Sequence, residues 1–246
     1  MTGVALDAAG RSFVDLHCHT IFSFDSLSDA AKVVAAAAKR GLTHLAITDH
    51  DRIEGALAAR EAAPSGLTVI VGEEIRSADG DLVGLYLAEA VPPGLSADET
   101  IAAIHAQGGL AGVPHPFDRL RGSGVAARHG LEVLERIASR LDYVETYNSR
   151  IPFGDANDRA AVFAHERGLP GVAVSDAHLV SEVGISYLGF DLPLDSAADL
   201  HAALEAGPAA MIMSKASILR RGFMPVAKTV QRMRGNHRVV PVVRQP

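Results

Sequence analysis

The sequence predicts an α/β protein whose strands close into a β/α barrel, and three observations support this prediction. Apolar, strand-like runs alternate with helix-like segments about seven times, an order typical of parallel strands joined by right-handed crossovers. The strand-like runs are short and rich in Val, Ile and Leu, as expected of strands buried on both faces. Polar side chains follow most of these runs, and in a barrel the carboxyl ends of all the strands meet on one face.

Local signals set the expected elements. Ser28 is expected to cap the first helix. Ser96 and Glu99 have the spacing of a capping box, and Asp79-Gly80 predicts a turn between two strands. Predicted strands occupy residues 13–20, 42–48, 67–71, 82–87, 110–113, 143–146, 171–174 and 209–213, and predicted helices occupy residues 29–40, 53–63, 97–107, 131–140, 156–167 and 197–206.

A doubly wound open sheet is the alternative arrangement for such an alternation. It would spread the strand ends along a line and bring fewer polar residues together, whereas a barrel collects them all. The length of 246 residues is usual for an α/β barrel built as one domain. The chain has no Gly-rich phosphate loop of the dinucleotide-binding or P-loop kind, so the barrel is favoured.

The composition describes a folded protein with an uneven charge distribution. Apolar residues make up 48% and charged residues 21% of the chain, and the net charge of −6 argues against a general nucleic-acid coat protein. Residues 215–246 contain eight Lys or Arg and no Asp or Glu. We therefore expect a β/α barrel domain over residues 1–214 and a basic tail over residues 215–246, in the same domain or appended to it. A solvated helix face is favoured for this tail over a contact with phosphate or a partner.

The sequence also predicts where the protein resides. Cys18 is the single cysteine, which excludes an internal disulfide and fits a reducing compartment. The first eleven residues lack a basic region followed by an apolar run, so no signal peptide is expected. The Ala-rich stretch at residues 30–38 is too short to span a bilayer. A cytoplasmic protein without a membrane partner is the expectation.

The stretch from Phe13 to Thr20 carries a pattern typical of metal ligands. If it is a strand, Asp15, His17 and His19 project from the same face, because side chains on a strand alternate. Two imidazoles on one face, one residue apart, can bind a single metal ion. Cys18 would point the other way and is expected to be part of the core.

Further ligand-type residues stand at the ends of later strand-like runs. These are His50, Glu74, His115, Asp176 and His178. A set of imidazoles and carboxylates without a thiolate suits Zn²⁺, Mn²⁺ or Fe²⁺ better than Ca²⁺. The number of ligands predicts two or three divalent ions, with a carboxylate bridging between them. Structural roles are expected for the remaining histidines, which are His44, His105, His129, His165, His201 and His237.

Five motifs in this order resemble the PHP (polymerase and histidinol phosphatase) superfamily. They are Asp-Leu-His17-Cys-His19-Thr, Thr48-Asp49-His50-Asp51, Gly72-Glu-Glu74-Ile, His115-Pro116 and Ser175-Asp176-Ala-His178. The stretches Ser23-Phe24-Asp25-Ser26 and Tyr147-Asn148-Ser149-Arg150 are similar to bacterial members described as metal-dependent phosphoesterases. The resemblance extends from about Phe13 to Phe190.

The resemblance implies a distorted (β/α)₇, TIM-like barrel with up to three metal ions. It implies that His17, His19, Glu74 and Asp176 hold the first ion, and that Glu74 bridges to a second ion shared with His115. It assigns Asp25, His50 and His178 to a third ion. Some members have a His in place of Asp25, and some carry a His near residues 145–148 that this chain lacks. Either Glu145 or Asn148 takes that place, or the second ion is loosely held.

The resemblance favours a phosphoesterase that hydrolyses a small phosphorylated metabolite or nucleotide with metal-activated hydroxide. Arg119, Arg150 and Asn148 are the expected substrate-binding residues, and Asp49 and His178 are the expected catalytic residues for proton transfer. The loop at residues 120–129 is expected to gate the site.

Three alternatives remain open from the sequence. The first is a phosphodiesterase or exonuclease on short nucleic acids, which the basic tail favours. The second is an amidohydrolase or deaminase that uses the same metals. The third is a non-catalytic module that binds metal or phosphate.

Overall fold

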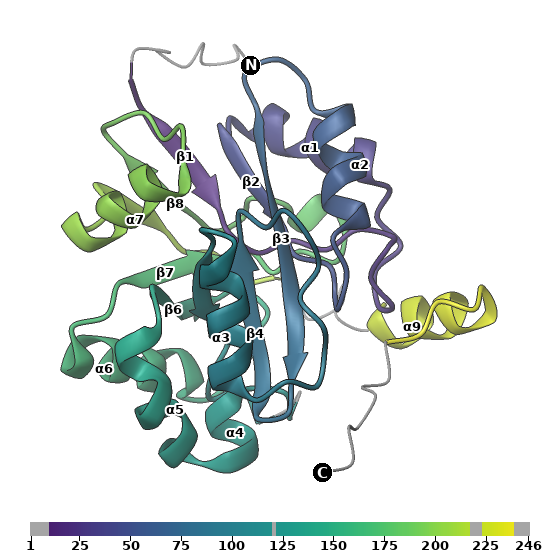
Figure 1. Cartoon of the computed structure of the whole chain (residues 1–246). Coiled ribbons are helices and arrows are strands. Elements are labelled where there is room, and N and C mark those ends of the chain that lie inside the picture. Colours follow the sequence, from purple (N-terminus) through teal and green to yellow (C-terminus); the bar gives the residue numbers. More distant parts are fainter. Residues whose placement is uncertain (1–9, 120–121, 217–222, 239–246) are drawn as a thin grey trace.

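A computed structural model describes residues 10–119, 122–216 and 223–238, and within them one sheet forms a nearly closed barrel (Figure 1). The strand order is β7-β6-β5-β4-β3-β2-β1-β8-β9. The expected α/β barrel is therefore confirmed. The strands are β1 (Ser12–Asp15), β2 (His44–Ile47), β3 (Thr68–Ser77), β4 (Gly80–Leu85), β5 (Leu110–Val113), β6 (Tyr143–Asn148), β7 (Gly171–Val174), β8 (Tyr187–Phe190) and β9 (Ala210–Ile212).

The expected parallel pairing holds for part of the sheet, and the turn predicted at Asp79-Gly80 joins an antiparallel pair. Strands β1, β2 and β3 pair in parallel, as do β5, β6 and β7. Strand β4 is antiparallel to both β3 and β5, because the turn at Asp79-Gly80 is too short for a crossover helix. Strand β8, which the sequence analysis missed, runs antiparallel to β1 and to β9.

The barrel closes through the residues that follow β1. Regular pairing ends at Asp15, earlier than expected, but Cys18 forms a parallel bridge with Ala177 after β7. The backbone N–H of His19 donates to the carbonyl of Ala177 at 2.8 Å, and the N–H of Thr48 donates to the carbonyl of Cys18 at 2.8 Å. Both histidines of the first motif are thereby held at the carboxyl end of the barrel.

Helices cover the outside of the sheet, with α1 and α2 packed together beside β2 and β3 (Figure 1). The capping box of Ser96 and Glu99 is confirmed. Asp29 rather than Ser28 caps α1, because the Ser28 hydroxyl donates to the carbonyl of His178 at 3.0 Å. The helices are α1 (Ala30–Arg40), α2 (Glu54–Ala62), α3 (Ala97–Ala106), α4 (Val125–His129), α5 (Leu131–Ile137), α6 (Ala156–Arg167), α7 (Ala197–Ala206) and α9 (Met224–Met233), with 3₁₀ turns at Ala138–Arg140 and Val180–Glu182.

Two apolar clusters form the core of the described part of the chain. One lies between the helices and the sheet and includes Val33 and Ile101. The other includes inward-facing strand residues such as Ile70 and Val172, and α7 contributes Leu200 and Leu204 to it. The predicted metal ligands are not part of this second cluster and lie at the carboxyl end of the barrel. Among the described residues, no helix combines the length and the apolar character needed to cross a membrane.

Candidate metal centre and active site

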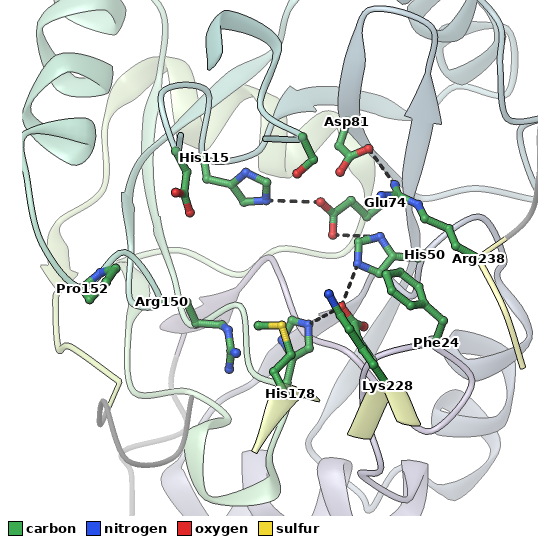
Figure 2. A pocket seen from close by; sticks show the side chains of 14 residues that line it. Phe24, His50, Glu74, Asp81, His115, Arg150, Pro152, His178, Lys228 and Arg238 are labelled. Atoms are coloured by element: carbon green, nitrogen blue, oxygen red, sulfur yellow. Dashed lines mark hydrogen bonds and ion pairs between the residues drawn. The ribbon is translucent and has the colours of Figure 1, made fainter. Parts of the chain in front are cut away.

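A cavity of about 340 Å³ opens at the carboxyl end of the barrel (Figure 2). Five of the predicted metal ligands line it: Asp25, His50, Glu74, His115 and His178. The other three, His17, His19 and Asp176, lie beneath its floor and are at most 1% exposed. The structure thus brings all eight predicted ligands to one place, although they come from segments spread over more than half of the chain.

The ligand atoms of the first predicted ion converge closely. The Nε2 atoms of His17 and His19 are 3.0 Å apart, and they lie 3.2 Å and 3.3 Å from Oε2 of Glu74. Oδ1 of Asp176 lies 3.7 Å from the first Nε2 and 3.5 Å from the second. Four ligands bound tetrahedrally at about 2.1 Å from one ion would be about 3.4 Å apart. The donor set therefore fits a divalent ion such as zinc.

Glu74 occupies the centre of the cluster. Its Oε2 faces His17 and His19 and also lies 3.4 Å from Nδ1 of His50, while its Oε1 lies 3.2 Å from Nε2 of His115. The residue is within β3, at the point where the parallel pairing with β2 ends and the hairpin with β4 begins. A carboxylate with its two oxygens directed to different imidazoles has the geometry of a bridging ligand.

A further group of donors is formed by Asp25, His50 and His178. Oδ2 of Asp25 is 3.5 Å from Nε2 of His50 and 3.3 Å from Nε2 of His178. The Ser23 hydroxyl donates to the other oxygen of Asp25 at 2.8 Å. These three residues and His19 have ligand atoms close enough together to hold a metal ion.

The charges in the cluster shift several pKa values. Burial alone would lower the pKa of His17 and of His19, but the surrounding carboxylates raise the first well above its usual value and the second to about 9. Burial alone would raise the pKa of Glu74, yet the histidines, His50 and His17 above all, hold it well below its usual range. Burial, with the Arg150 guanidinium, lowers the pKa of His178 to about 3. The carboxylates thus favour protonated imidazoles at His17 and His19, and a cation bound there would replace these protons.

The backbone is strained at two of the ligands. His115 has φ of 29° and Asp176 has φ of 49°, in the left-handed region that non-glycine residues seldom adopt. Such conformations persist where the surrounding structure enforces them, and they concentrate at functional sites. Here they follow β5 and β7 directly and turn the side chains inward.

Glu145 and Asn148, the predicted substitutes for a missing histidine, lie behind the ligands. Oε1 of Glu145 is 2.5 Å from Nδ1 of His17, and its Oε2 accepts from the backbone N–H of His115 at 3.1 Å. The Asn148 amide donates to Glu145 at 2.9 Å and to Asp176 at 3.0 Å. Both residues are buried outside the cavity lining, in positions that orient ligands.

Some of the predicted substrate-binding and catalytic residues line the cavity, and others do not. Arg150 lines the cavity and donates to Glu182 at 2.9 Å, whereas Arg119 is exposed outside the lining. His178 lines the cavity. Asp49 does not, because its two carboxylate oxygens accept from the backbone N–H and the hydroxyl of Thr20 at 2.6 Å and 2.5 Å.

Several lining residues escaped the sequence analysis. Asp81 of β4 is buried, and its Oδ1 accepts from Arg238 at 2.6 Å. Arg238 also donates to Asp51 at 3.2 Å and lines the cavity together with Lys228 of α9. Asp81 could have been noticed in the sequence, because an aspartate inside an apolar strand is unusual. No local pattern in the sequence indicates that Arg238 and Lys228 reach the cavity. In Figure 2, Arg238, Lys228 and Phe24 face Arg150 and Pro152 across the cavity.

The histidines assigned structural roles lie elsewhere among the described residues. Nε2 of His44 is 2.7 Å from the carbonyl of Leu194, and His105 and His201 contact Asp142 on the outside of the barrel. None of the six lines the cavity. Cys18 is fully buried, as predicted for a core residue. Of the loop expected to gate the site, residues 120–121 are outside the described residues, and residues 125–129 form α4.

The chain is similar in sequence or in fold to several known proteins. The uncharacterized protein MJ1587 of Methanocaldococcus jannaschii is 39% identical over 157 residues, covering 59% of this chain and 87% of that protein. A two-domain protein from Bacteroides vulgatus, containing a predicted PHP-like metal-dependent phosphoesterase, superposes with a TM-score of 0.67 at 18% identity, over 85% of this chain and 66% of that chain. The lesion-specific endonuclease EndoQ of Pyrococcus furiosus superposes with a TM-score of 0.63 at 15% identity, over 82% of this chain and 58% of that chain.

The two structural likenesses concern the fold. At the level of sequence, the family model of the PHP domain matches residues 15–152 and that of the PHP-associated region matches residues 154–208. These ranges contain every predicted metal ligand. The chain belongs to the PHP domain family.

Proposed function

We propose that this protein is a metal-dependent phosphoesterase that hydrolyses a small phosphorylated metabolite or nucleotide, with a phosphomonoester favoured over a diester. The observation that carries the proposal is the convergence of seven buried His and Asp residues around the buried Glu74, in and beneath the lining of a cavity that also contains cationic side chains. Members of the PHP superfamily are typically metal-dependent hydrolases, and the fold is shared with a PHP-like phosphoesterase.

The donor set fits two or three divalent ions. In this proposal His17, His19, Glu74 and Asp176 hold the first, and Asp25, His50 and His178 hold another, while Glu74 and His115 offer a less complete position. Ions bound there would supply positive charge for the phosphoryl oxygens and a water molecule of lowered pKa. The nitrogen and oxygen donors suit Zn²⁺, Mn²⁺ or Fe²⁺.

The protein's own side chains position the substrate and keep the ligands in place. Arg150 presents a guanidinium to the cavity from one side and Lys228 presents an ammonium from the other, so that an anionic group is attracted from both. Arg119, exposed outside the lining, is a less direct candidate. Asn148 acts through Asp176 and Glu145, which it holds by its amide.

Of the two residues expected to transfer protons, His178 lines the cavity and Asp49 does not. The low pKa of His178 keeps its imidazole neutral when no ion is bound, so it can hold an ion or accept a proton but is not charged to protonate the leaving group. Both oxygens of Asp49 are engaged by Thr20, and the residue has no access to the cavity. Asp49 would then hold the backbone that carries His50.

The test is phosphate release from nucleotides, sugar phosphates and short oligonucleotides, with Mn²⁺ or Zn²⁺ and with a chelator. The expected result is release from one class of monoester that is lost with chelator and in His17→Ala, but not in His165→Ala, which changes a histidine on α6 away from the cavity. No release from any compound by a protein that still binds metal would reject the proposal.

A diesterase acting on short nucleic acids is the second candidate. The fold likeness to a lesion-specific endonuclease and the two cations of the C-terminal segment, Lys228 and Arg238, favour it. It predicts metal-dependent cleavage of oligonucleotides whose rate falls steeply with salt, because phosphate contacts release counterions. Absence of cleavage would leave the monoesterase, and cleavage without salt dependence would remove Lys228 and Arg238 from the contact with nucleic acid.

A further inference from the structure

The C-terminal segment, residues 223–238, is joined to the loop after β1 by a set of side-chain hydrogen bonds. Gln231 is 1% exposed, and its amide nitrogen lies 2.6 Å from the carbonyl of Ile21, 2.9 Å from that of Ser23 and 2.6 Å from that of Ser26. One side chain thus contacts three carbonyl groups within six residues of a loop more than two hundred positions earlier in the chain.

Two further residues extend this attachment. The amide nitrogen of Asn236 lies 3.4, 3.1 and 3.3 Å from the carbonyls of Ile21, Phe22 and Ser23. Arg238 forms ion pairs with Asp51 and Asp81 at the wall of the cavity. The segment is therefore attached to the mouth of the barrel at both the loop and the wall.

The loop that receives these hydrogen bonds carries Asp25. The Ser23 hydroxyl donates to Asp25, and the Ser26 hydroxyl donates to the carbonyl of His178 at 2.9 Å. The position of the Asp25 carboxylate, 3.3 Å from His178, thus depends on the backbone of residues 21–26, whose carbonyls are directed to the segment.

Apolar contact alone does not explain why α9 stays on this loop. Phe223, Val226 and Met233 are 44%, 48% and 83% exposed, and the buried residues of the helix are Ala227 and Gln231. A buried amide facing three carbonyls is costly to remove, since each carbonyl then loses a donor. The hydrogen-bonded face is the specific part of the contact.

We propose that Gln231 and Asn236 are positioning residues of the metal centre, which hold the loop at residues 21–26 so that Asp25 faces His50 and His178. The inference deepens the proposed function, since it rests on the assignment of these three residues to one ion. Residues 223–238 of the basic tail are then part of the site rather than a solvated appendage. Its loss would empty one metal position and leave the position at His17, His19, Glu74 and Asp176 filled.

The test counts ions per chain by mass spectrometry of the dialysed protein and measures affinities by calorimetry with Zn²⁺ or Mn²⁺. Gln231→Met keeps the length of the side chain and removes the amide, and Asp25→Asn removes the ligand itself. Gln231→Met is expected to lower the affinity for one ion by about tenfold, the size usual when a residue that orients a ligand is lost. Asp25→Asn should lower the affinity for the same ion further. Asn236→Ala should give a smaller effect in the same direction.

The matched control is Gln107→Met at the end of α3, whose side chain accepts from the backbone of Ala88 and Glu89 away from the cavity. It should leave every ion in place. The inference is overturned if Gln231→Met and Asn236→Ala, folded by circular dichroism, bind all ions as the unaltered protein does, or if Asp25→Asn loses none. The readout does not involve turnover, so a protein that binds its ions without hydrolysing phosphoesters would reject the proposed function alone.

Discussion

Oε1 of Glu145 lies 2.5 Å from Nδ1 of His17, on the side of the imidazole opposite to the Nε2 atom that faces Glu74 and His19. This contact fixes which ring nitrogen carries the proton and directs the other toward the predicted ion. Because Glu145 also accepts from the backbone of His115, one carboxylate supports ligands on two strands.

Glu145→Gln is expected to lower the affinity for the first ion by about ten- to a hundredfold, since it replaces a charged acceptor by an amide of the same shape. Calorimetric titration of the metal-free protein measures the effect. Glu135→Gln, which removes a carboxylate paired with Arg167 on the surface, is the control and should bind metal normally. Equal affinities of the two variants would contradict the role given to Glu145.

Glu74 and its neighbour Glu73 provide a second test, because only one of them faces the cluster. Oε2 of Glu73 accepts from the backbone N–H of Val91 at 2.8 Å, and burial raises the pKa of Glu73 to about 8. Glu74→Gln should lower metal content and reduce turnover by about a hundredfold or more. Glu73→Gln should keep its metal ions, and a loss of ions in both variants would show that the bridging assignment is wrong.

Metal binding at neutral pH should release protons. The pKa of His19 is raised to about 9 by Asp176 and Glu74, which overcome the effect of burial, so its imidazole is protonated at pH 7 without metal. An ion needs the neutral imidazole, and its affinity should therefore increase as the pH rises toward 9. Calorimetry at pH 7 in two buffers of different ionisation enthalpy would detect the released protons as a difference in apparent enthalpy, and identical enthalpies would contradict this.

The same shift gives the sign of the stability change in the metal-free protein. A histidine whose folded-state pKa is raised stabilises the folded state fully below its unfolded value of about 6.5, and this contribution is lost as the pH rises through the folded value. The melting temperature of the protein without metal is therefore expected to decrease as the pH is raised from about 6.5 to about 9, as far as His17 and His19 determine it. Saturating metal should remove this dependence.

Asp49→Asn should affect stability more than catalysis. The substitution weakens the two hydrogen bonds from Thr20, with an expected loss of about 1–3 kcal/mol in the free energy of unfolding. Chemical denaturation measures the loss, and the pH profile of the metal-loaded enzyme should keep its shape. A displaced limb of that profile would instead assign a proton-transfer role to Asp49.

Lys228→Gln should raise KM for the phosphorylated substrate by about three- to tenfold, because one charge near the cavity mouth is removed while the metal ligands are untouched. Arg232→Gln removes a charge from the same helix at an exposed position outside the cavity lining. Initial-rate kinetics and metal analysis of both variants make the comparison. Equal KM values would remove Lys228 from the substrate site.

The sequence was sufficient to predict the barrel because the alternation of elements is a short-range pattern, and strand-end positions together with the resemblance to the PHP superfamily, which alone supplied Asp25, identified the candidate ligands. The alternation of apolar runs with helices predicts the fold, and the motifs at Asp15–Thr20 and Ser175–His178 each contain two ligands at close spacing. The structure brings these two motifs together through the bridge between Cys18 and Ala177, as a barrel requires.

What the sequence did not predict depends on contacts between distant segments. Ser28 has the local properties of a helix N-cap, but its hydroxyl donates to the carbonyl of His178. Asp29 is the N-cap of α1 instead. Arg238 and Gln231 belong to a basic tail whose composition resembles a solvated helix. Their partners, Asp51, Asp81 and the loop carbonyls, are set by tertiary packing alone.

The contact between Gln231 and the loop at residues 21–26 also bears on the order in which the protein matures. During synthesis the amino-terminal ligands emerge first, and the residues that hold Asp25 in place emerge more than two hundred residues later. A nascent chain can therefore gather His17, His19, Glu74 and Asp176 once β7 has formed, while the position at Asp25 stays incomplete until residue 236 has left the ribosome. With Gln231 and Asn236 in their proposed role, loading of the centre would be stepwise, and its last step would depend on the completion of residues 223–238.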